Sequence, residues 1–384
     1  MNKFTLRHIL LCLIIFLNLF VSSSFAFEFW RFSRYRIGCL VPLSGDDERL
    51  GKEALKGLLL GLEILERHSS FTISVYDSGG KARQAVQAVE KMVEDGCDVA
   101  VALLGKKTAR PTLVEAQQRR LPVIAMTAEP DIPTGGYIYR DFVSPEIQME
   151  NLVGFITTKL GFSSFAVLYP ENEYGYLYLS LFEDKVKKYG GKIITAISYP
   201  AGISDFGTQI KKILGEEIVE AKPEEILTNS PSLPFEAVFI PDDVLTSTFI
   251  ISQFAYYNVD NLVFLGTALW YDKKFIHKIR GYCKAVYFPT GFTSQASQPW
   301  VKEFLSDFQG HYSTPPNYLT AQAYEIGRVL IYLKKFNKLD IQNMHEYIQN
   351  FPGITGVTSF LPNGEVTKKI YIMKGENGAI SIAP

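Results

Sequence analysis

The sequence predicts an α/β protein of two lobes, each built on a doubly wound parallel β-sheet. Short apolar runs alternate with stretches of helical period from residue 36 to about 142, and the same alternation starts again near residue 145. Runs such as "VAVALL" at 99–104 contain no polar alternation, which is typical of strands buried on both faces. A chain of 384 residues is also long enough for two domains.

The first strand–helix unit of lobe 1 has the clearest pattern. An apolar strand at Ile37–Leu43 leads through a Pro-Ser-Gly turn into a helix at Glu48–Arg67. The apolar face of this helix has three- and four-residue spacing and comprises Leu50, Ala54, Leu55, Leu58, Leu59, Leu62 and Leu65. Gly57 and Gly61 lie one turn apart, so we expect the helix to approach the sheet closely there.

The rest of lobe 1 repeats this unit, and a glycine ends its second helix. The expected elements are a strand in "FTISVYDSGG", a helix at Lys81–Asp95, a strand in "DVAVALLG", a helix at Pro111–Arg120 and a strand in "LPVIAMTA", followed by "YIYRDF".

Lobe 2 repeats the alternation and ends differently. Its expected strands are "FAVLYP", "KIITAISYP", "FEAVFIPDD", "LVFLGTAL" and "AVYFPTGF", and its expected helices are Pro145–Leu160, "GYLYLSLFEDKVKKYGG", "DFGTQIKKIL" and Thr246–Tyr257. Two helices follow at Trp300–Tyr312 and Leu319–Lys335, and then alternating strands flank Asn363-Gly364, a strong hairpin signal. The acidic, then Pro/Ser-rich stretch 215–234 is expected to be a surface excursion.

Composition limits the possible functions. The net charge of −1 argues against a generally cationic nucleic-acid binder. Aromatic residues make up 13% of the chain, and they either fill the core or line a pocket. The five histidines form no H-x-x-x-H or H-E-x-x-H pair, and the cysteines have no zinc-site spacing, so we expect no cofactor and no catalytic metal.

The N-terminal segment reads as a secretory signal peptide. A basic start containing Lys3 and Arg7 precedes the apolar run "ILLCLIIFLNLFV", and small residues follow it. We expect residues 1–26 to be removed by cleavage after Ala26, because the run is short for a membrane span. Cys39, Cys97 and Cys283 then remain, an odd number that does not indicate a disulfide framework.

One enzyme pattern needs to be weighed. "SGGK" at Ser78–Lys81 fits S-x-x-K, the serine–lysine pair of penicillin-binding enzymes, and Lys107-Thr108-Ala109 faintly echoes K-T-G. In those enzymes the serine opens a helix, whereas Ser78 ends a strand here, and no S-x-N follows. We therefore expect a protein without enzymatic activity.

Several longer motifs resemble a known family. "IGCLVPLSGDDERLGKEALKGLLLGLE", "YDSGGKARQAVQAVEKMVEDGCDVAVALLG", "LYPENEYGYLYLSLFEDKVKKYGGKII", "YPAGISDFGTQIKKI", "GHYSTPPNYLTAQAYEIG" and "FPGITGVTSFLPNGE" are similar, in this order, to blocks of the type I periplasmic solute-binding proteins of the leucine/isoleucine/valine-binding branch. "PVIAMTAEPDIP", "YRDFVSPEIQMENLV", "VFIPDD", "FAYYNV" and "LGTALW" resemble a closer sub-branch, the penicillin-binding-protein activators. The resemblance covers nearly the whole mature chain.

The resemblance implies how the chain is divided. Lobe 1 would comprise residues 35–142 plus 294–351, and lobe 2 would comprise 143–293 plus 352–384, with 215–234 as an insertion. The three crossovers between the lobes would form a hinge, and ligands would bind between the lobes.

The resemblance also implies candidate ligand contacts. In the amino-acid-binding relatives, lobe 1 holds the ligand carboxylate with hydroxyls and backbone N–H groups, and lobe 2 supplies a tyrosine and a carboxylate for the ammonium. The matching residues here are Ser44, Thr108, Thr127, Tyr174, Asp242, Thr267 and Trp270. The lobe-1 grip departs from the family pattern, because "GKKTAR" and "TAEP" stand where G-P-x-S-S and S-A-T-N-P are usual.

Each candidate also has a purely structural interpretation. Ser44 suits its own turn, Thr108 suits a helix cap, and Asp242 or Asp243 suits the cap of the helix that follows. Trp270 is either a lid or a core residue.

Two classes of function remain open. The first is an exported receptor for a small amino-acid-like or carboxylate molecule, working in the periplasm with a membrane permease of the ABC type or as a sensor. The alternative is a penicillin-binding-protein activator that acts in cell-wall synthesis by contact with a penicillin-binding enzyme. Neither involves nucleic acid, and each reaches the membrane only through partners.

Overall fold

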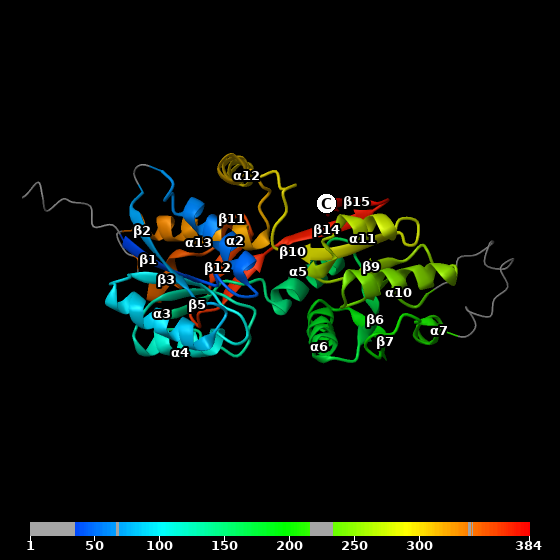
Figure 1. The fold of residues 1–384 in the computed structure, drawn as a ribbon. Coiled ribbons are helices and arrows are strands. Elements are labelled where there is room, and N and C mark those ends of the chain that lie inside the picture. The colour runs from blue at the N-terminus through cyan, green and yellow to red at the C-terminus, as the bar shows by residue number, and fades with distance from the viewer. Residues whose placement is uncertain (1–34, 67–68, 216–232, 337–338, 340) are drawn as a thin grey trace, which may run out of the picture.

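A computed structural model describes residues 35–66, 69–215, 233–336, 339 and 341–384. Two lobes lie side by side and are joined by chain segments that cross between them (Figure 1). The expected α/β architecture with two mainly parallel sheets is confirmed. The expected signal peptide and most of the expected insertion at 215–234 lie outside the described residues.

Lobe 1 is built on a five-stranded parallel sheet with the strand order β2-β1-β3-β4-β5. Its strands are β1 (Tyr35–Val41), β2 (Phe71–Asp77), β3 (Val99–Leu103), β4 (Val123–Met126) and β5 (Ile138–Arg140). Its helices are α2 (Glu48–Gly61), α3 (Ala82–Glu94), α4 (Ala109–Gln118), α12 (Pro299–Tyr312), α13 (Tyr318–Lys334) and α14 (Met344–Tyr347), with a short turn of helix η2 (Ile341–Asn343). Alternate residues of β1 point to opposite faces: Ile37, Cys39 and Val41 pack under α2 and α13, and Leu40 packs under α3 and α4.

The glycines of α2 meet another helix and not the sheet, so that expectation was wrong. A Cβ atom on Gly57 would collide with the backbone carbonyl of Thr320, and one on Gly61 with the carbonyl of Tyr324. Both carbonyls belong to α13, which packs closely along α2. The helix also ends six residues earlier than expected, and Leu65 beyond its end is exposed.

Lobe 2 is built on a seven-stranded sheet with the order β15-β14-β10-β9-β8-β6-β7. Its strands are β6 (Ser164–Pro170), β7 (Lys192–Tyr199), β8 (Ala237–Phe239), β9 (Val263–Leu265), β10 (Ala285–Thr290), β14 (Tyr371–Glu376) and β15 (Ala379–Ile382). The helices α5 (Pro145–Thr158) and α6 (Glu173–Lys188) cover one face, and α7 (Gly207–Leu214), α10 (Val244–Tyr256) and α11 (Lys273–Lys278) cover the other. Only β14 and β15 run antiparallel to their neighbours.

The expected hairpin at Asn363-Gly364 is confirmed, but its place in the fold differs from the expectation. Strand β12 (Gly356–Phe360) pairs antiparallel with β13 (Val366–Lys369), and β11 (Phe351–Gly353) completes a separate three-stranded sheet. Phe360 and Val366 pack in the core of lobe 1, so the boundary placed at residue 352 is too early. We propose that the chain passes to lobe 2 at about residue 370, because β14 is the first later strand in the lobe-2 sheet.

Helix α13 contacts all three crossovers between the lobes. The Tyr318 hydroxyl accepts a hydrogen bond from the backbone N–H of Val143 in the first crossover (3.3 Å). The Tyr318 ring lies against Gly291 at the start of the second, where a Cβ atom would clash with it. Glu325 accepts a hydrogen bond from Lys368 beside the third (2.8 Å). One helix of lobe 1 therefore anchors the hinge.

Candidate ligand-binding cleft

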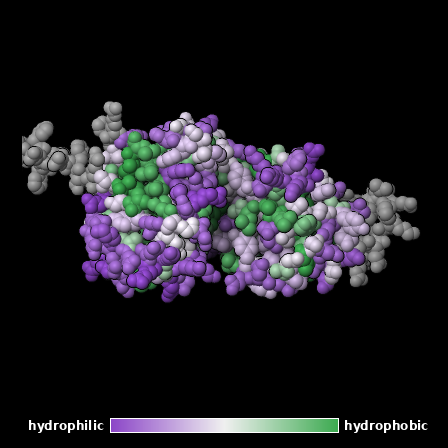
Figure 2. Space-filling model, viewed as in Figure 1, coloured by the Kyte–Doolittle hydropathy of each residue, from purple (hydrophilic) through white to green (hydrophobic). Residues whose placement is uncertain are grey.

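The molecule is hollowed between its two lobes, as Figure 2 shows. On lobe 1, the loops after β1, β2 and β3 form a pocket of about 240 Å³, here called the lobe-1 pocket. Its lining residues are Pro42, Asp46, Asp47, Ser78, Gly79, Gly80, Leu103, Gly105, Lys106, Lys107 and Thr108. Ligands of open α/β sheets usually bind at such carboxyl-end loops.

The Ser44 hydroxyl stabilises its own turn. It donates a hydrogen bond to Asp77 Oδ2 (2.7 Å), and Asp77 also accepts from the backbone N–H groups of Leu43 and Gly79. Burial disfavours the Asp77 carboxylate, but these hydrogen bonds outweigh it and lower the pKa of Asp77. The structure thus places Ser44 at the rim of lobe 1, where its hydroxyl proton is already donated to Asp77.

The two threonines of lobe 1 are buried and close their own loops. Thr108 Oγ1 accepts from the Gly105 N–H (3.0 Å) and lies 3.2 Å from the Gly105 carbonyl, so it does not cap α4 through its side chain. Thr127 Oγ1 accepts from the Glu129 N–H (3.2 Å). Lys106 is exposed just before α4. Its positive charge favours an anion there, and so does the N-terminal end of the α4 dipole.

On lobe 2, Tyr174 and Thr267 meet although they are far apart in the chain. The Tyr174 hydroxyl donates to Thr267 Oγ1 (3.0 Å), and its ring packs on Tyr178 with centroids 4.5 Å apart. Burial raises the pKa of Tyr174, so its hydroxyl stays protonated at neutral pH. Gln148 holds this arrangement from α5, because its Oε1 accepts from both the Tyr178 hydroxyl and the Ala268 N–H.

The two adjacent aspartates after β8 have different roles. Asp243 caps α10, since its side chain accepts from the N–H groups of Leu245 and Thr246 (both 2.8 Å). Asp242 accepts from the Tyr199 hydroxyl (2.5 Å) and from the Asp243 N–H. Burial raises the pKa of Asp242 despite these hydrogen bonds. Asp242 is therefore the carboxylate that is not used as a helix cap.

Trp270 is a core residue and not a lid, which corrects its place among the candidate contacts. Its side chain is completely buried, and its indole N–H donates to the Asp242 carbonyl and to Ser247 Oγ (both 3.1 Å). A Cβ atom on Gly266 would collide with the indole ring. Trp270 thus lies in the core beneath the loop that carries Asp242 and stabilises that loop.

Sequence reasoning missed the apolar side chains at the lobe-2 strand ends. Tyr176, Leu245, Leu269 and Tyr271 follow β6, β8 and β9, and each is exposed. Hydrophobic residues are common on surfaces singly, but four at the ends of three neighbouring strands suit the apolar part of a ligand. The signal was present in the sequence, because each of these apolar residues stands two to four positions after a strand-end polar residue.

The enzyme pattern has no reactive geometry. Ser78 is buried, its Oγ accepts from the Gly80 N–H (3.4 Å), and its carbonyl accepts from the Lys81 N–H within a tight turn, while the Lys81 side chain is exposed. Within the described ranges, no group of three or more His, Cys, Asp or Glu residues is arranged to hold a metal ion. Along the same part of the chain, every helix falls short of the length and apolar character that a bilayer span requires.

Comparison with protein families identifies the family. A family model described as periplasmic binding protein matches residues 34–379. The chain belongs to this family. It is a family of non-enzymatic solute-binding proteins, in agreement with the absence of an enzyme expected from the sequence.

A curated relative is the Leu/Ile/Val-binding protein homolog 3 of Brucella melitensis biotype 1, which is 24% identical over 196 residues. The match covers 48% of this chain, and the chain spans only about half (52%) of that relative.

Three solved structures share the fold of this periplasmic binding protein, and this chain is covered to 91% in each comparison. An ABC-type branched-chain amino acid transporter from Rhodopseudomonas palustris CGA009 has a TM-score of 0.71 at 15% identity over 95% of its chain. The substrate-binding protein LivJ from Streptococcus pneumoniae, in complex with isoleucine, has a TM-score of 0.60 at 18% identity over 99% of its chain. A solute-binding protein from R. palustris, in complex with benzoate, has a TM-score of 0.56 at 16% identity over 95% of its chain.

Proposed function

We propose that this periplasmic binding protein captures a small carboxylate, with an amino acid as the first candidate, as the substrate-binding component of an ABC-type transporter or as a sensor. The observation that carries the proposal is the lobe-2 rim, where the Tyr174–Thr267 hydroxyl pair and the Asp242 carboxylate follow three neighbouring strands. Structural relatives bind isoleucine and benzoate, which are both small carboxylates.

Each part of such a ligand has a suitable partner. The exposed Lys106 and the positive N-terminal end of the α4 dipole favour a carboxylate on lobe 1. Asp242 and the Tyr174 hydroxyl suit an ammonium group on lobe 2. Leu269 and Tyr271 offer apolar surface beside them. Binding between the lobes would close them around the ligand.

A thermal-shift experiment with isoleucine and benzoate tests the proposal. A ligand that binds only the folded protein raises Tm in a concentration-dependent way. Isoleucine carries an ammonium group and benzoate does not, so Asp242→Asn should remove the response to isoleucine and keep any response to benzoate. The matched control is Asp260→Asn, an exposed aspartate that precedes β9 and so lies at the opposite edge of the lobe-2 sheet.

The outcomes separate the parts of the proposal. Loss of the isoleucine response in both aspartate variants would remove the role given to Asp242. No shift with either compound, or with a wider panel of amino acids and small carboxylates, would contradict the receptor function.

The alternative is the penicillin-binding-protein activator, which acts by protein contact. It is favoured because lobe 1 departs from the pattern by which amino-acid-binding relatives hold the ligand carboxylate. Ser44 and Thr108 direct their hydroxyls into their own loops. The wild-type protein as bait should then recover a penicillin-binding enzyme from detergent-solubilised membranes, with no thermal shift from small molecules. Recovery of permease subunits together with a ligand-induced shift would support the transporter component instead.

Export to the periplasm with cleavage after Ala26 is part of the same proposal, and the N-terminal sequence of the mature protein tests it. A mature protein that begins at Met1 would contradict the proposed cleavage.

A further inference from the structure

The outer edge of the lobe-1 sheet is open. Strand β2 is the last in the order β2-β1-β3-β4-β5, and it lies on the side of lobe 1 away from lobe 2 (Figure 1). Among the described residues, β1 is the only element that pairs with the backbone between Thr72 and Tyr76. The N–H and C=O groups that point outward from this stretch are therefore available to another strand.

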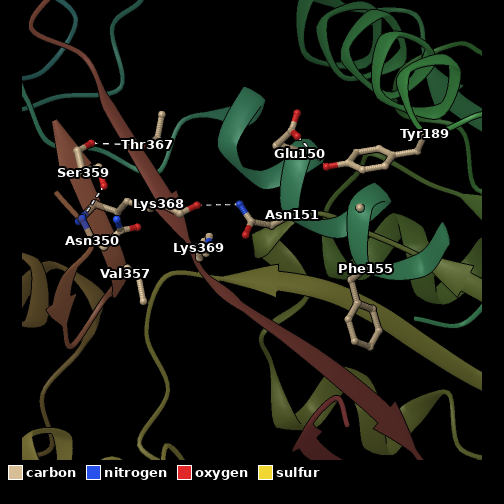
Figure 3. Close-up of a pocket in the computed structure, with 11 residues that line it drawn as sticks. Glu150, Asn151, Phe155, Tyr189, Asn350, Val357, Ser359, Thr367, Lys368 and Lys369 are labelled. Carbon is tan, nitrogen blue, oxygen red and sulfur yellow. Dashed lines mark hydrogen bonds between the residues drawn. The ribbon is translucent and has the colours of Figure 1, made fainter. Parts of the chain in front are cut away.

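Two other edges in the described part of the chain are covered by neighbouring segments. At β5, the Arg140 N–H donates to the carbonyl of Gly364 in the hairpin (2.8 Å). At β13, Asn151 of α5 donates to the Lys368 carbonyl (2.9 Å), as Figure 3 shows. Covering an edge in this way prevents its pairing with a strand of another molecule.

The remaining edges are short or irregular. Strand β15 has four residues, and Gln295 donates to its Ile380 carbonyl (2.9 Å). Strand β11 has three residues, and the Trp300 indole N–H donates to its Gly353 carbonyl (3.2 Å). Strand β7 carries an extra residue, Ile194, where its register with β6 shifts. Such a bulge bends an edge strand and disturbs further pairing.

Strand β2 has none of these protections. It pairs with β1 over seven consecutive residues without a register shift. The stretch Phe71–Tyr76 contains no charge, proline or glycine, and its Thr72, Ile73 and Val75 are β-branched. The Val75 side chain is 41% exposed. A long, regular and uncharged edge of this kind is a template for strand pairing.

An apolar stripe of α2 lies beside this edge. Helix α13 covers the β5 side of the sheet, where it contacts Asp141, and it meets α2 at Gly57 and Gly61. The opposite side of α2 therefore faces β2, and it carries the half-buried Leu55 and Leu59. Figure 2 shows an apolar area on lobe 1 over this part of α2 and β2.

The stripe and the strand have the same midpoint. A Cβ atom on Gly51 would collide with the Pro42 carbonyl, so the start of α2 is level with the end of β1. Gly38, which pairs with Ser74 of β2, lies about 13 Å back along β1 at about 3.3 Å per residue. Helix α2 returns over the same length in roughly nine residues at about 1.5 Å each, which reaches the level of Leu59.

We propose that the β2 edge is the interface of a symmetric dimer, in which β2 pairs antiparallel with β2 of a second copy about a two-fold axis at Ser74. This register places Ile73 opposite Val75 of the second copy, and Thr72 opposite Tyr76 of the second copy. Pairs of apolar residues, and of β-branched with aromatic residues, stabilise neighbouring strands. The sheet of one lobe 1 then continues into the sheet of the other.

Charge complementarity favours a second copy over an unrelated strand. The same axis brings Leu59 of the two α2 helices together above the joined strands, and it places Lys52 opposite Glu66 of the second copy. Both charged side chains are exposed, and the pair of Lys52 with Glu48 of its own helix is exposed as well. Strand β2 has no charge before Asp77, so the pairing opposes no like charges.

Light scattering on a size-exclusion column measures the mass in solution. The wild-type protein should change from one chain to two as its concentration rises. Val75→Lys places a charge on the paired edge, so this variant should remain a single chain. Val114→Lys is the matched control, because Val114 is similarly exposed (37%) on α4 of the same lobe, and it should dimerise like wild type. Circular dichroism checks that both variants are folded.

A cysteine at the proposed axis tests the register. Directly opposite residues of antiparallel strands have Cα atoms about 4.5–5.5 Å apart, which suits a disulfide. Ser74→Cys should therefore form a covalent dimer when diamide is the oxidant. The matched control is Ser306→Cys, exposed on α12 of the same lobe, and wild type controls for the three native cysteines.

The outcomes decide the proposal. A wild-type protein that stays a single chain at every concentration would overturn it and leave the edge to a strand of another protein. A dimer that persists in Val75→Lys, or that cross-links no better through Ser74→Cys than through Ser306→Cys, would overturn the assignment to β2. The edge lies away from lobe 2, so the proposal does not rest on ligand binding, and the thermal-shift responses test that function separately.

Discussion

Replacement of Lys368 by methionine should destabilise the protein strongly at neutral pH and much less in mild acid. Lys368 is completely buried, and it pairs with Asp141 and Glu325, whose side chains are each 1% exposed. Methionine keeps the bulk of the side chain but removes the only positive charge among the ionisable groups of this cluster. Two buried carboxyl groups then have no cation beside them, and a buried charge without a partner is costly.

The size of the stability loss in Lys368→Met follows from the free energy needed to protonate a buried carboxyl group. Burial opposes ionisation of Glu325, but attraction to Lys368 and hydrogen bonds from Lys368, Thr358 and Thr355 outweigh it and lower its pKa. Lys368 lowers the pKa of Glu325, whereas burial raises that of Asp141, so the loss of Lys368 changes the protonation of Glu325 most. Protonating a carboxyl group of ordinary pKa about 4.3 costs about 3.7 kcal/mol at pH 7 and about 1 kcal/mol at pH 5.

The sign of the pH dependence differs between the two proteins. A lowered pKa in wild type means that Glu325 stabilises the fold above its unfolded pKa, and that this stability is lost as pH falls through the folded pKa. In Lys368→Met the pKa of Glu325 is raised, so the variant gains stability as pH falls towards 5. The gap between the two free energies of unfolding should therefore shrink by about 3 kcal/mol from pH 7 to pH 5.

Urea denaturation followed by circular dichroism at both pH values measures this gap. The control is Lys374→Met, which removes an ion pair with Glu376 (2.9 Å) whose members are 25% and 42% exposed. That variant should lose less than about 1 kcal/mol at both pH values. Equal losses in the two variants at pH 7, or a Lys368→Met gap that does not change with pH, would refute the reasoning.

Three further predictions concern packing and capping, and the same denaturation assay checks them. Gly61→Ala should destabilise the protein by about 1–3 kcal/mol, because the added methyl group meets the Tyr324 carbonyl. The control Gly310→Ala in α12 has open space around it and should be neutral or stabilise the protein by up to about 1 kcal/mol. Equal effects of the two substitutions would contradict the close contact of α2 with α13. Trp270→Phe should cost about 1–3 kcal/mol by leaving two acceptors without the indole N–H, and should keep the thermal-shift response to any ligand; loss of that response with an intact fold would restore Trp270 as a ligand contact. Ser144→Ala should cost about 1 kcal/mol because the side chain caps α5, and an unchanged stability would argue against the cap.

Most elements could be predicted because their signals are local. The alternation of strands and helices places β1, β3 and β10 within a few residues of the structure, and Asn363-Gly364 marks a real hairpin. Period and turn chemistry depend on neighbours in the chain, so they can be read without knowing the fold.

The candidate site could be predicted only in part, because the fate of a polar side chain depends on its partners in space. Tyr174 and Thr267 meet as the alternation implies, since both follow strands of one parallel sheet. Only the observed start of α10 shows that Asp243, and not Asp242, is the capping residue. Only the complete burial of Trp270 shows that it belongs to the core. No local pattern separates a capping aspartate from its neighbour in such a pair.

The sequence by itself determined the class of the protein: two α/β lobes, no reactive constellation, and polar residues at the strand ends of both halves. Only the tertiary structure decided that Gly57 and Gly61 accommodate α13, that β12 and β13 belong to lobe 1, and that Lys368 meets Asp141 at the hinge. The reason is physical. Secondary structure follows from steric and hydrophobic preferences within a few residues, whereas a buried ion pair or a close helix contact depends on which distant segments the fold brings together.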